Sequence, residues 1–356
     1  MTSALDSVEN HGRRPPSMSD VAARAGVSHQ TVSRVLNTPE RVRTSTRERV
    51  QQVIDELGYR RNRAAHALAT ARSSTIGILT IGNAHFGPSS TVLAVEAAAR
   101  SRGYFVSVSS LESAESGAAQ AALGLLVDQG VDGIIVVAPL VDVAEFVERA
   151  ALNIPLVIAA ANPQATPTGK LRYVCVDQCA GTRLAVEHLI ALGHQRIAHV
   201  SGLSTWIDAS ERLAEFRRLM DRPGLQALEY RADGWAAAHG YAVGLEHADE
   251  ILSGQGPTAI FAANDYIAQG LLRAFWERGL RVPEDVSVIG FDDVESSAFF
   301  VPSISTVRQP FELLGQAAME ALAEVQAGAA PKPGRFEAVL APELVVRGSC
   351  AAPRRR

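Results

Sequence analysis

Five polar side chains in one short segment have the chemistry needed to read DNA bases. In residues 28–37, SHQTVSRVLN, the apolar residues recur at the spacing of one helix face. The other face would carry His29, Gln30, Thr31, Ser33 and Arg34. Glutamine can pair with adenine through two hydrogen bonds, threonine can contact a base edge, and arginine can bind guanine or hold a phosphate. With Ser28 and Asn37 at the two ends of the segment, these residues are the candidate DNA contacts.

A second set of polar side chains follows predicted strands, where open α/β sheets bind their ligands. Asn264 follows the strand AIFAA, Asp292 follows VSVIGF, and Arg212 lies beyond the loop after a strand at 196–200. An amide, a carboxylate and a guanidinium together can satisfy the hydroxyl groups of a polyol, and the indole of Trp235 can cover an apolar sugar face. Taken singly, an Asp or Asn after a strand usually caps the next helix, and that reading stays open.

The candidate reading helix is the second of two short helices joined by a tight turn. Ser19 and Asp20 are residues that cap helices, and Gly26 stands where the first helix must end. The apolar face of this first helix is formed by Val21, Ala22 and Ala25. The pattern is typical of a helix-turn-helix whose second helix enters the major groove, although a helical hairpin with a polar face would share it.

A third helix is expected after the pair, because Ser45 and Glu48 have capping-box spacing before another periodic run. The apolar residues of that run are Val50, Val53, Ile54 and Leu57. The following stretch, 59–70, is Ala-rich and basic but too short to be stable alone as a helix. From the residues alone it can be a bare linker.

From Ile76 onward the pattern alternates between strands and helices. Strands are predicted at 76–81, 104–109, 133–137, 156–160, 196–200, 259–263 and 286–291. Helices are predicted at 91–102, 117–129, 179–192, 210–220, 235–252 and 267–278. This order predicts doubly wound parallel sheets, and roughly 280 residues favour two such sheets facing each other across a cleft.

Charge and cysteine content narrow the class of protein. Residues 1–72 hold 12 arginines against 7 acidic residues, a net charge of +5, while the rest of the chain carries 22 basic and 31 acidic residues, a net of −9. A basic amino-terminal segment followed by an acidic remainder suits contact with phosphates at one end of the chain.

The three cysteines lack framework or metal-site spacing, which favours reduced structural thiols in the cytoplasm. No membrane span or signal peptide is evident, and residues 1–16 are expected to be a disordered tail.

The stretch DVAARAGVSHQTVSRVLN resembles the amino-terminal signature of the lactose repressor family, and the resemblance continues through the whole chain. It implies a helix-turn-helix domain at 17–61, a hinge helix at 62–73 that orders only on DNA, and a periplasmic-binding-protein-like core at 74–350 with a tail at 351–356. The implied amino-terminal subdomain covers 74–176 and 310–336, and the carboxyl-terminal one 177–308 and 337–347. In the hinge, Asn62 and Ala65 match the family pattern, and Leu68 would be a wedge in the minor groove.

The same resemblance implies an inducer site. Arg212, Asn264 and Asp292 would hold sugar hydroxyls with Trp235 against the ring, and Gln309 and Phe311 would complete the site. A loop carrying His85, Gly87 and Pro88 would close over the aglycone side. Two departures from the family, at Val137–Pro139 and at Ile158–Asn162, remove an Asn and an Asp and predict an apolar wall on the side of the first subdomain.

The sequence therefore predicts an allosteric, homodimeric transcriptional regulator that binds double-stranded operator DNA. It is expected to be a repressor released by a sugar or glycoside, with a β-galactoside as the first hypothesis. A sugar-binding transport protein is the alternative, although it would need export. A glycosidase is a distant third, since adjacent Asp292 and Asp293 should point to opposite sides. The sequence also has no Walker motif, no G-x-G-x-x-G after a strand, no G-x-S-x-G and no H-E-x-x-H, which weakens an enzyme reading. No cofactor or metal is expected.

The stretch after Arg347 lacks a heptad pattern and contains a proline, which predicts a solvated tail and a dimer that does not become a tetramer.

Overall fold

The computed structural model describes residues 16–60, 72–82, 85–111, 116–150, 152–162 and 167–354. The chain divides into two compact units, 1–73 and 74–356. The hinge candidates Asn62, Ala65 and Leu68 lie outside the described residues. Within the described part of the chain, no helix is long and apolar enough to cross a membrane.

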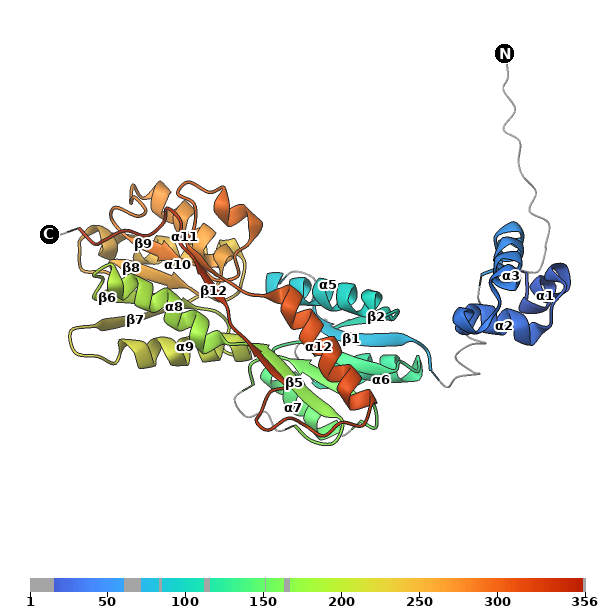
Figure 1. The fold of residues 1–356 in the computed structure, drawn as a ribbon. Helices are drawn as coiled ribbons and strands as arrows, with labels where there is room; N and C mark the ends of the chain where they lie inside the picture. The colour runs from blue at the N-terminus through green and yellow to red at the C-terminus, as the bar shows by residue number, and fades with distance from the viewer. Residues whose placement is uncertain are drawn as a thin grey trace, which may run out of the picture. The chain divides into compact units, whose positions relative to one another are not determined.

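The first unit is a three-helix domain. It consists of α1 Met18–Ala25, α2 His29–Asn37, a 3₁₀ turn at Pro39–Arg41 and α3 Thr44–Leu57 (Figure 1). Its small core contains Val21, Ala22, Ala25, Val32, Val35, Val50, Val53, Ile54 and Tyr59. Apart from Tyr59, which follows α3, these are residues that helical spacing places on the inner faces, so the periodicity orients all three helices.

The ends of these helices agree with the sequence at two points and differ at two. Gly26 adopts a left-handed conformation with a φ of 62° and ends α1, and the Ser28 side chain caps α2 by accepting from the Thr31 amide at 3.1 Å. Helix α1, however, is capped by Ser17, which forms a capping box with Asp20. Helix α3 begins after Arg43 without a side-chain cap, so the Ser45–Glu48 box expected from spacing is wrong.

The second unit contains two parallel sheets, as predicted. The larger sheet has the order β11-β5-β4-β3-β1-β2. Its strands are β1 Thr75–Ile81, β2 Phe105–Leu111, β3 Gly133–Val137, β4 Leu156–Ala159, β5 Leu171–Val176 and β11 Ala338–Leu340. Helices α5 Phe86–Ser101 and α12 Phe311–Gln326 cover one face, and α6 Ser116–Asp128 and α7 Val141–Ala150 cover the other.

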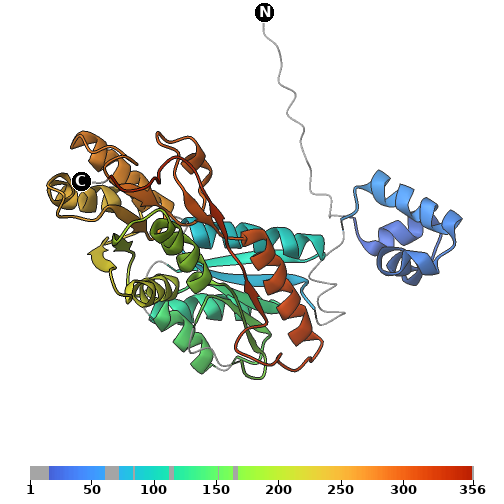
Figure 2. The same ribbon diagram turned by 60° about the vertical axis from the view of Figure 1, so that its left-hand side comes forward.

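The smaller sheet has the order β7-β6-β8-β9. Its strands are β6 Arg196–Ser201, β7 Gln226–Arg231, β8 Ala259–Ala262 and β9 Ser287–Ile289. Helices α8 Gln178–Ala191 and α9 Ile207–Met220 cover one face, and α10 Ala237–Leu252 and α11 Asp265–Glu277 cover the other (Figure 2). A 3₁₀ turn at Glu295–Ala298 precedes β10 Thr306–Arg308, which pairs with β12 Glu343–Val345 in a separate antiparallel ribbon.

The chain passes between the two sheets three times: after β5, between β10 and α12, and between β11 and β12. The resemblance assigns all of residues 337–347 to the smaller subdomain. That is wrong, because Ala338–Leu340 still pairs in parallel with Val174–Val176 of β5. The crossing therefore lies between Leu340 and Glu343.

The stretch after β12 is also different from the solvated tail that its composition predicts. Ser349 is fully buried, its carbonyl accepts from the Val288 amide at 2.9 Å, and the Ala351 amide donates to the Ser287 hydroxyl at 3.0 Å. The Ala351 carbonyl lies 2.8 Å from Nε2 of the buried His194. Residues 349–351 are thus part of the smaller subdomain, alongside β9.

Candidate functional site

Helix α2 presents a polar face on the first unit. His29, Gln30 and Arg34 are exposed, while Thr31 and Ser33 are half-buried. The hydroxyl groups of Ser28 and Thr31 lie 2.9 Å apart, which fixes the first turn of the helix. Since Val32 and Val35 are buried on the opposite face, the exposed side chains of α2 can reach a neighbouring molecule without disturbing the core.

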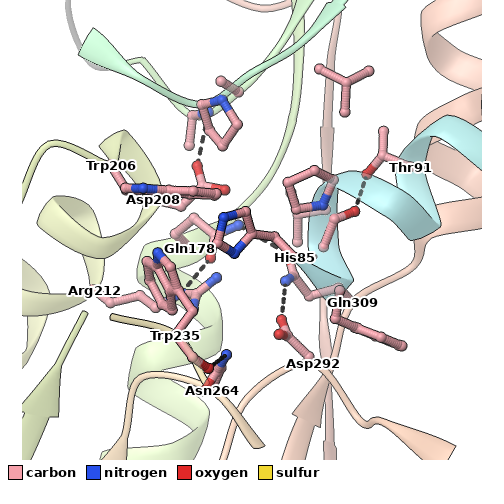
Figure 3. Close-up of a pocket in the computed structure, with 18 of the residues that line it drawn as sticks. His85, Thr91, Gln178, Trp206, Asp208, Arg212, Trp235, Asn264, Asp292 and Gln309 are labelled. Atoms are coloured by element: carbon pink, nitrogen blue, oxygen red, sulfur yellow. Dashed lines mark hydrogen bonds between the residues drawn. The ribbon is translucent and has the colours of Figure 1, made fainter. Parts of the chain in front are cut away.

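A cleft of about 420 Å³ lies between the two sheets of the second unit, at the carboxyl ends of their strands (Figure 3). It brings together all eight effector-site candidates that the sequence suggests: His85, Pro88, Arg212, Trp235, Asn264, Asp292, Gln309 and Phe311. Pockets of this size hold small organic ligands. Among the described residues no cluster of side chains could hold a metal ion.

A row of hydrogen-bonded side chains forms the polar floor of the cleft. Arg212 donates from Nε to the Gln178 Oε1 atom at 2.9 Å, and Gln178 donates to the Gln309 Oε1 atom at 3.1 Å. Gln309 in turn donates to Asp292 at 2.6 Å. These residues come from α9, α8 and the segments at the ends of β9 and β10. The row therefore joins four chain segments at one ligand-facing surface.

Arg212 is held firmly at the start of this row. Its Nη1 atom donates to the Ala263 carbonyl, and its guanidinium lies 3.9 Å from the centre of the Phe291 ring. The side chain is 4% exposed, and burial lowers the pKa of Arg212 while the carboxyl groups of Asp292 and Asp208 raise it. Because its geometry is fixed before any ligand arrives, the guanidinium can orient an incoming hydroxyl group without further ordering.

Asp292 faces the cleft from an unusual backbone conformation, with a φ of 106°. Burial raises the pKa of Asp292 from 3.8 to about 6, although the charge of Arg212 and the hydrogen bond from Gln309 oppose the shift. Positive φ is strained for a residue other than glycine, and such strain is concentrated at functional sites. Here it directs a carboxylate toward the cleft beside a guanidinium.

Asn264 has the capping role that was left open for it. Its Oδ1 atom accepts from the Ile267 amide at 2.8 Å, which caps α11, and its Nδ2 atom donates to the Trp235 carbonyl at 3.1 Å. The amide still lines the cleft. It therefore fixes the helix that follows and the loop that carries Trp235, in addition to any contact with a ligand.

Aromatic rings form one side of the cleft. The Trp206 ring packs edge-on against both His85 and Trp235, with ring centres 4.9 Å and 5.2 Å away. The Trp235 indole nitrogen is buried and has no hydrogen-bond partner among the described residues. Gly202 permits this packing, because a Cβ atom there would lie 2.3 Å from the Trp235 ring. Indole faces of this kind bind the apolar faces of sugars.

The side of the larger sheet is apolar, as the two departures from the family predict. Val137, Pro139 and the three alanines Ala159, Ala160 and Ala161 line it. His85 and Pro88 do not lie on a free loop, however. His85 is the residue before α5, and Pro88 is in the first turn of that helix, which begins five residues earlier than the periodicity indicates.

Several polar or aromatic residues of the cleft are missing from the sequence-based set, among them Gln178, Trp206 and Asp208. Trp206 and Asp208 lie in and after the loop that follows β6, so the same strand-end rule that selects Arg212 could have found them. Gln178 opens α8 after β5, a strand that the sequence does not predict.

Comparison with known proteins places this geometry in a family. Residues 17–62 match the model of bacterial regulatory proteins of the lacI family, and residues 186–350 match a periplasmic binding protein-like domain. The lactose operon repressor of Escherichia coli K12 is 39% identical over 341 residues, 96% of this chain and 92% of that protein. This chain belongs to the lacI family. It is thus a DNA-binding transcriptional regulator, and the resemblance found in its sequence is confirmed.

Two solved structures of lacI-family proteins extend the match to the whole fold. A lac repressor dimer bound to operator and the anti-inducer ONPF superimposes with a TM-score of 0.85 at 37% identity, covering 95% of this chain and all of that one. A complex of the transcriptional regulator CelR with cellobiose gives a TM-score of 0.68 at 31% identity, covering 94% and 99%. The transport-protein alternative is thereby set aside, since the helix-turn-helix unit is part of the match.

Proposed function

We propose that this regulator is a homodimeric repressor of sugar-utilisation genes, released from its operator by a neutral sugar or glycoside bound in the cleft. The observation that carries the proposal is the cleft itself, where Arg212, Asp292 and Gln309 form a hydrogen-bonded polar floor next to Trp206 and Trp235. A sugar needs both kinds of surface, because its hydroxyl groups form hydrogen bonds with polar side chains and the apolar face of its ring packs against an indole.

The proposed DNA contacts are the exposed residues of α2, with Gln30 and Arg34 reading bases and His29 adjusting half-site preference. A dimer would place one α2 in each half-site of a near-palindromic operator, as two-fold symmetry requires. The hinge candidates Asn62, Ala65 and Leu68 are retained as proposed minor-groove contacts. Relatives support this reading, since one of them, the lac repressor, is a dimer on its operator.

Ligand control would act through the contacts that join the two halves of the core. On one side of the cleft the Ile207 amide donates to the Pro139 carbonyl at 2.9 Å, and the Val141 amide donates to the Thr205 carbonyl at 3.3 Å. A sugar bound next to these bonds would favour one arrangement of the halves over the other. The difference in affinity between the two arrangements is the free energy available to release DNA.

The test is a titration of operator-bound protein with a panel of neutral sugars, led by β-galactosides because of the identity to the lactose operon repressor. At least one sugar should release the wild type. Asp292→Ala should bind operator but need about 5- to 150-fold more sugar, since a buried hydroxyl loses its acceptor at ~1–3 kcal/mol. Asp233→Ala is the matched control, because Asp233 is exposed, precedes Trp235 by two residues and does not line the cleft.

Two results would contradict the proposal. Release by nucleobases or amino acids with no response to any sugar would assign the cleft to another ligand class. A normal sugar response by Asp292→Ala would place the sugar elsewhere.

A further inference from the structure

Asp208 is a second carboxyl group in the cleft, and its protein contacts leave most of its hydrogen-bonding capacity unused. It lies in the first turn of α9 and is half-buried, facing the open space of the cleft. Its Oδ1 atom accepts from the Ala161 amide at a long distance of 3.4 Å. Within the described part of the chain its carboxyl group makes no other hydrogen bond, although a carboxylate can accept about four.

Asp208 and Arg212 project from the same face of α9, because four residues separate them. The charge of Arg212 is felt by both Asp208 and Asp292. The guanidinium therefore interacts electrostatically with two carboxyl groups, and its Nε and Nη1 atoms are already bonded to Gln178 and Ala263. The carboxyl group of Asp208 therefore keeps acceptor sites that Arg212 does not occupy, which suits a ligand that donates from hydroxyl groups.

Asp208 supplies a hydrogen-bond acceptor next to the apolar wall of the larger sheet, which lacks polar side chains at Val137, Pro139 and Ala159–Ala161. On that wall the Ala161 backbone N–H is the polar group that Asp208 reaches, and the nearby Asn162 side chain instead donates to Glu148 at 3.2 Å. The backbone bonds of Thr205 and Ile207 to the larger subdomain hold the start of α9 against this wall. Asp208 is thus the carboxyl group that a ligand meets between Trp206 and the apolar wall, which includes Ala161.

We propose that Asp208 determines effector specificity: it accepts a hydroxyl hydrogen bond from the part of the ligand that lies against the wall of the larger sheet, and it rejects anionic sugars. The inference rests on the proposed function and narrows it. The ligand would be a neutral glycoside with hydroxyl groups on both of its parts, such as a disaccharide. A phosphate or carboxylate next to Asp208 and Asp292 would meet two like charges against one guanidinium, and like charges at close range strongly disfavour binding.

The experiment measures release from operator and direct binding by calorimetry for lactose, cellobiose and the 6-phosphate of each. The wild type should respond to a neutral disaccharide at least about tenfold better than to its phosphate. Asp208→Ala should weaken the response to the neutral disaccharide by about tenfold or more. Asp208→Asn keeps the shape and the acceptor facing Ala161 but removes the charge, so it should narrow the difference between neutral and phosphorylated sugar.

The control is Asp233→Asn, which removes an exposed carboxylate outside the cleft and should change neither response. Operator affinity without sugar is measured first for each variant, so that a misfolded chain is recognised. If the neutral disaccharide releases Asp208→Ala and Asp208→Asn as it releases the wild type, the role of Asp208 is wrong while the proposed function stands. Equal release of the wild type by neutral and phosphorylated sugar also overturns it. If no sugar releases the wild type, both proposals fail.

Discussion

Two adjacent aspartates after β9 have opposite environments. Asp292 faces the cleft and accepts from Gln309, whereas Asp293 forms ion pairs with Arg308 and Arg347, both at 2.6 Å. Both residues have positive φ, 106° and 55°, so the turn that separates their side chains is held by these contacts on both sides. One carboxylate is therefore available to a ligand, and its neighbour stabilises the ribbon of β10 and β12.

The environment of Asp292 predicts that sugar affinity depends on pH. Burial raises the pKa of Asp292 from 3.8 to about 6, so the group takes up a proton as the pH falls through this value. A hydroxyl group that donates to Asp292 needs the carboxylate form. Sugar affinity should then be constant above about pH 7 and fall by up to about tenfold per pH unit below about pH 6.

Calorimetry between pH 5 and pH 8 with a releasing sugar checks this prediction. Asp292→Asn should bind more weakly and lose most of the slope, because its amide does not titrate in this range. A wild-type affinity that is the same at both ends of the range would show that the carboxylate form is not required.

Helices α10 and α11 pack so closely that their glycines admit no side chain. A Cβ atom at Gly270 would lie 2.0 Å from the Ala237 carbonyl oxygen, and one at Gly240 would lie 2.1 Å from that of Ile267. These contacts involve backbone atoms, which cannot rotate away. The pair of helices thus forms a rigid support for the loops that carry Trp235 and Asn264.

We expect Gly270→Ala to destabilise the core by at least about 2 kcal/mol, because overpacking of this kind forces two backbones apart. Gly124→Ala is the matched change, since Gly124 is also within a helix but has open space around it. It should stabilise by about 0.5–1 kcal/mol, the usual gain on replacing a helical glycine. Urea unfolding of the full chain without DNA measures both, and similar midpoints for the two variants would contradict the packing argument.

Among the helices and strands, the sequence predicts best the buried strands, because their residues form continuous apolar runs, as in β1, β3 and β8. It does not predict β5, since Arg172 interrupts the pattern. That arginine is buried because its Nε atom pairs with Glu337 at 2.9 Å, a partner 165 positions away. The polar strand β7 is missed because it lies at the edge of its sheet, where one side faces solvent. Contacts between distant segments decide both cases.

The sequence likewise predicts some residues of the cleft and misses others. Arg212, Asn264 and Asp292 follow strands that the sequence predicts, and their convergence follows from the geometry of parallel sheets. Gln178 follows the missed strand β5. The strand-end rule places Trp206 and Asp208 near the cleft, but their contacts with Leu140 and Ala161 of the larger subdomain cannot be predicted from the local sequence.

The distribution of charge over the whole molecule follows its division into two units. Residues 1–72 carry a net charge of +5, and the remaining residues carry −9. The boundary between the two compact units falls next to this change of sign, at 73 and 74. The basic unit suits contact with phosphates, whereas the net charge of the acidic unit does not favour binding to DNA.

This separation predicts that salt affects the two binding activities differently. Between about 50 and 200 mM salt, operator affinity should fall by well over tenfold, because phosphate contacts by arginine release counterions. Sugar affinity should change by less than about twofold.

Gln30→Ala should lower operator affinity by ~1–3 kcal/mol at every salt concentration without changing the slope of affinity against salt, since a neutral side chain that reads a base displaces no counterion. Fluorescence anisotropy on operator and on random DNA measures both the affinity and its dependence on salt. An equal loss on the two DNAs, or a shallower slope for Gln30→Ala, would assign Gln30 to the phosphate backbone instead of to a base.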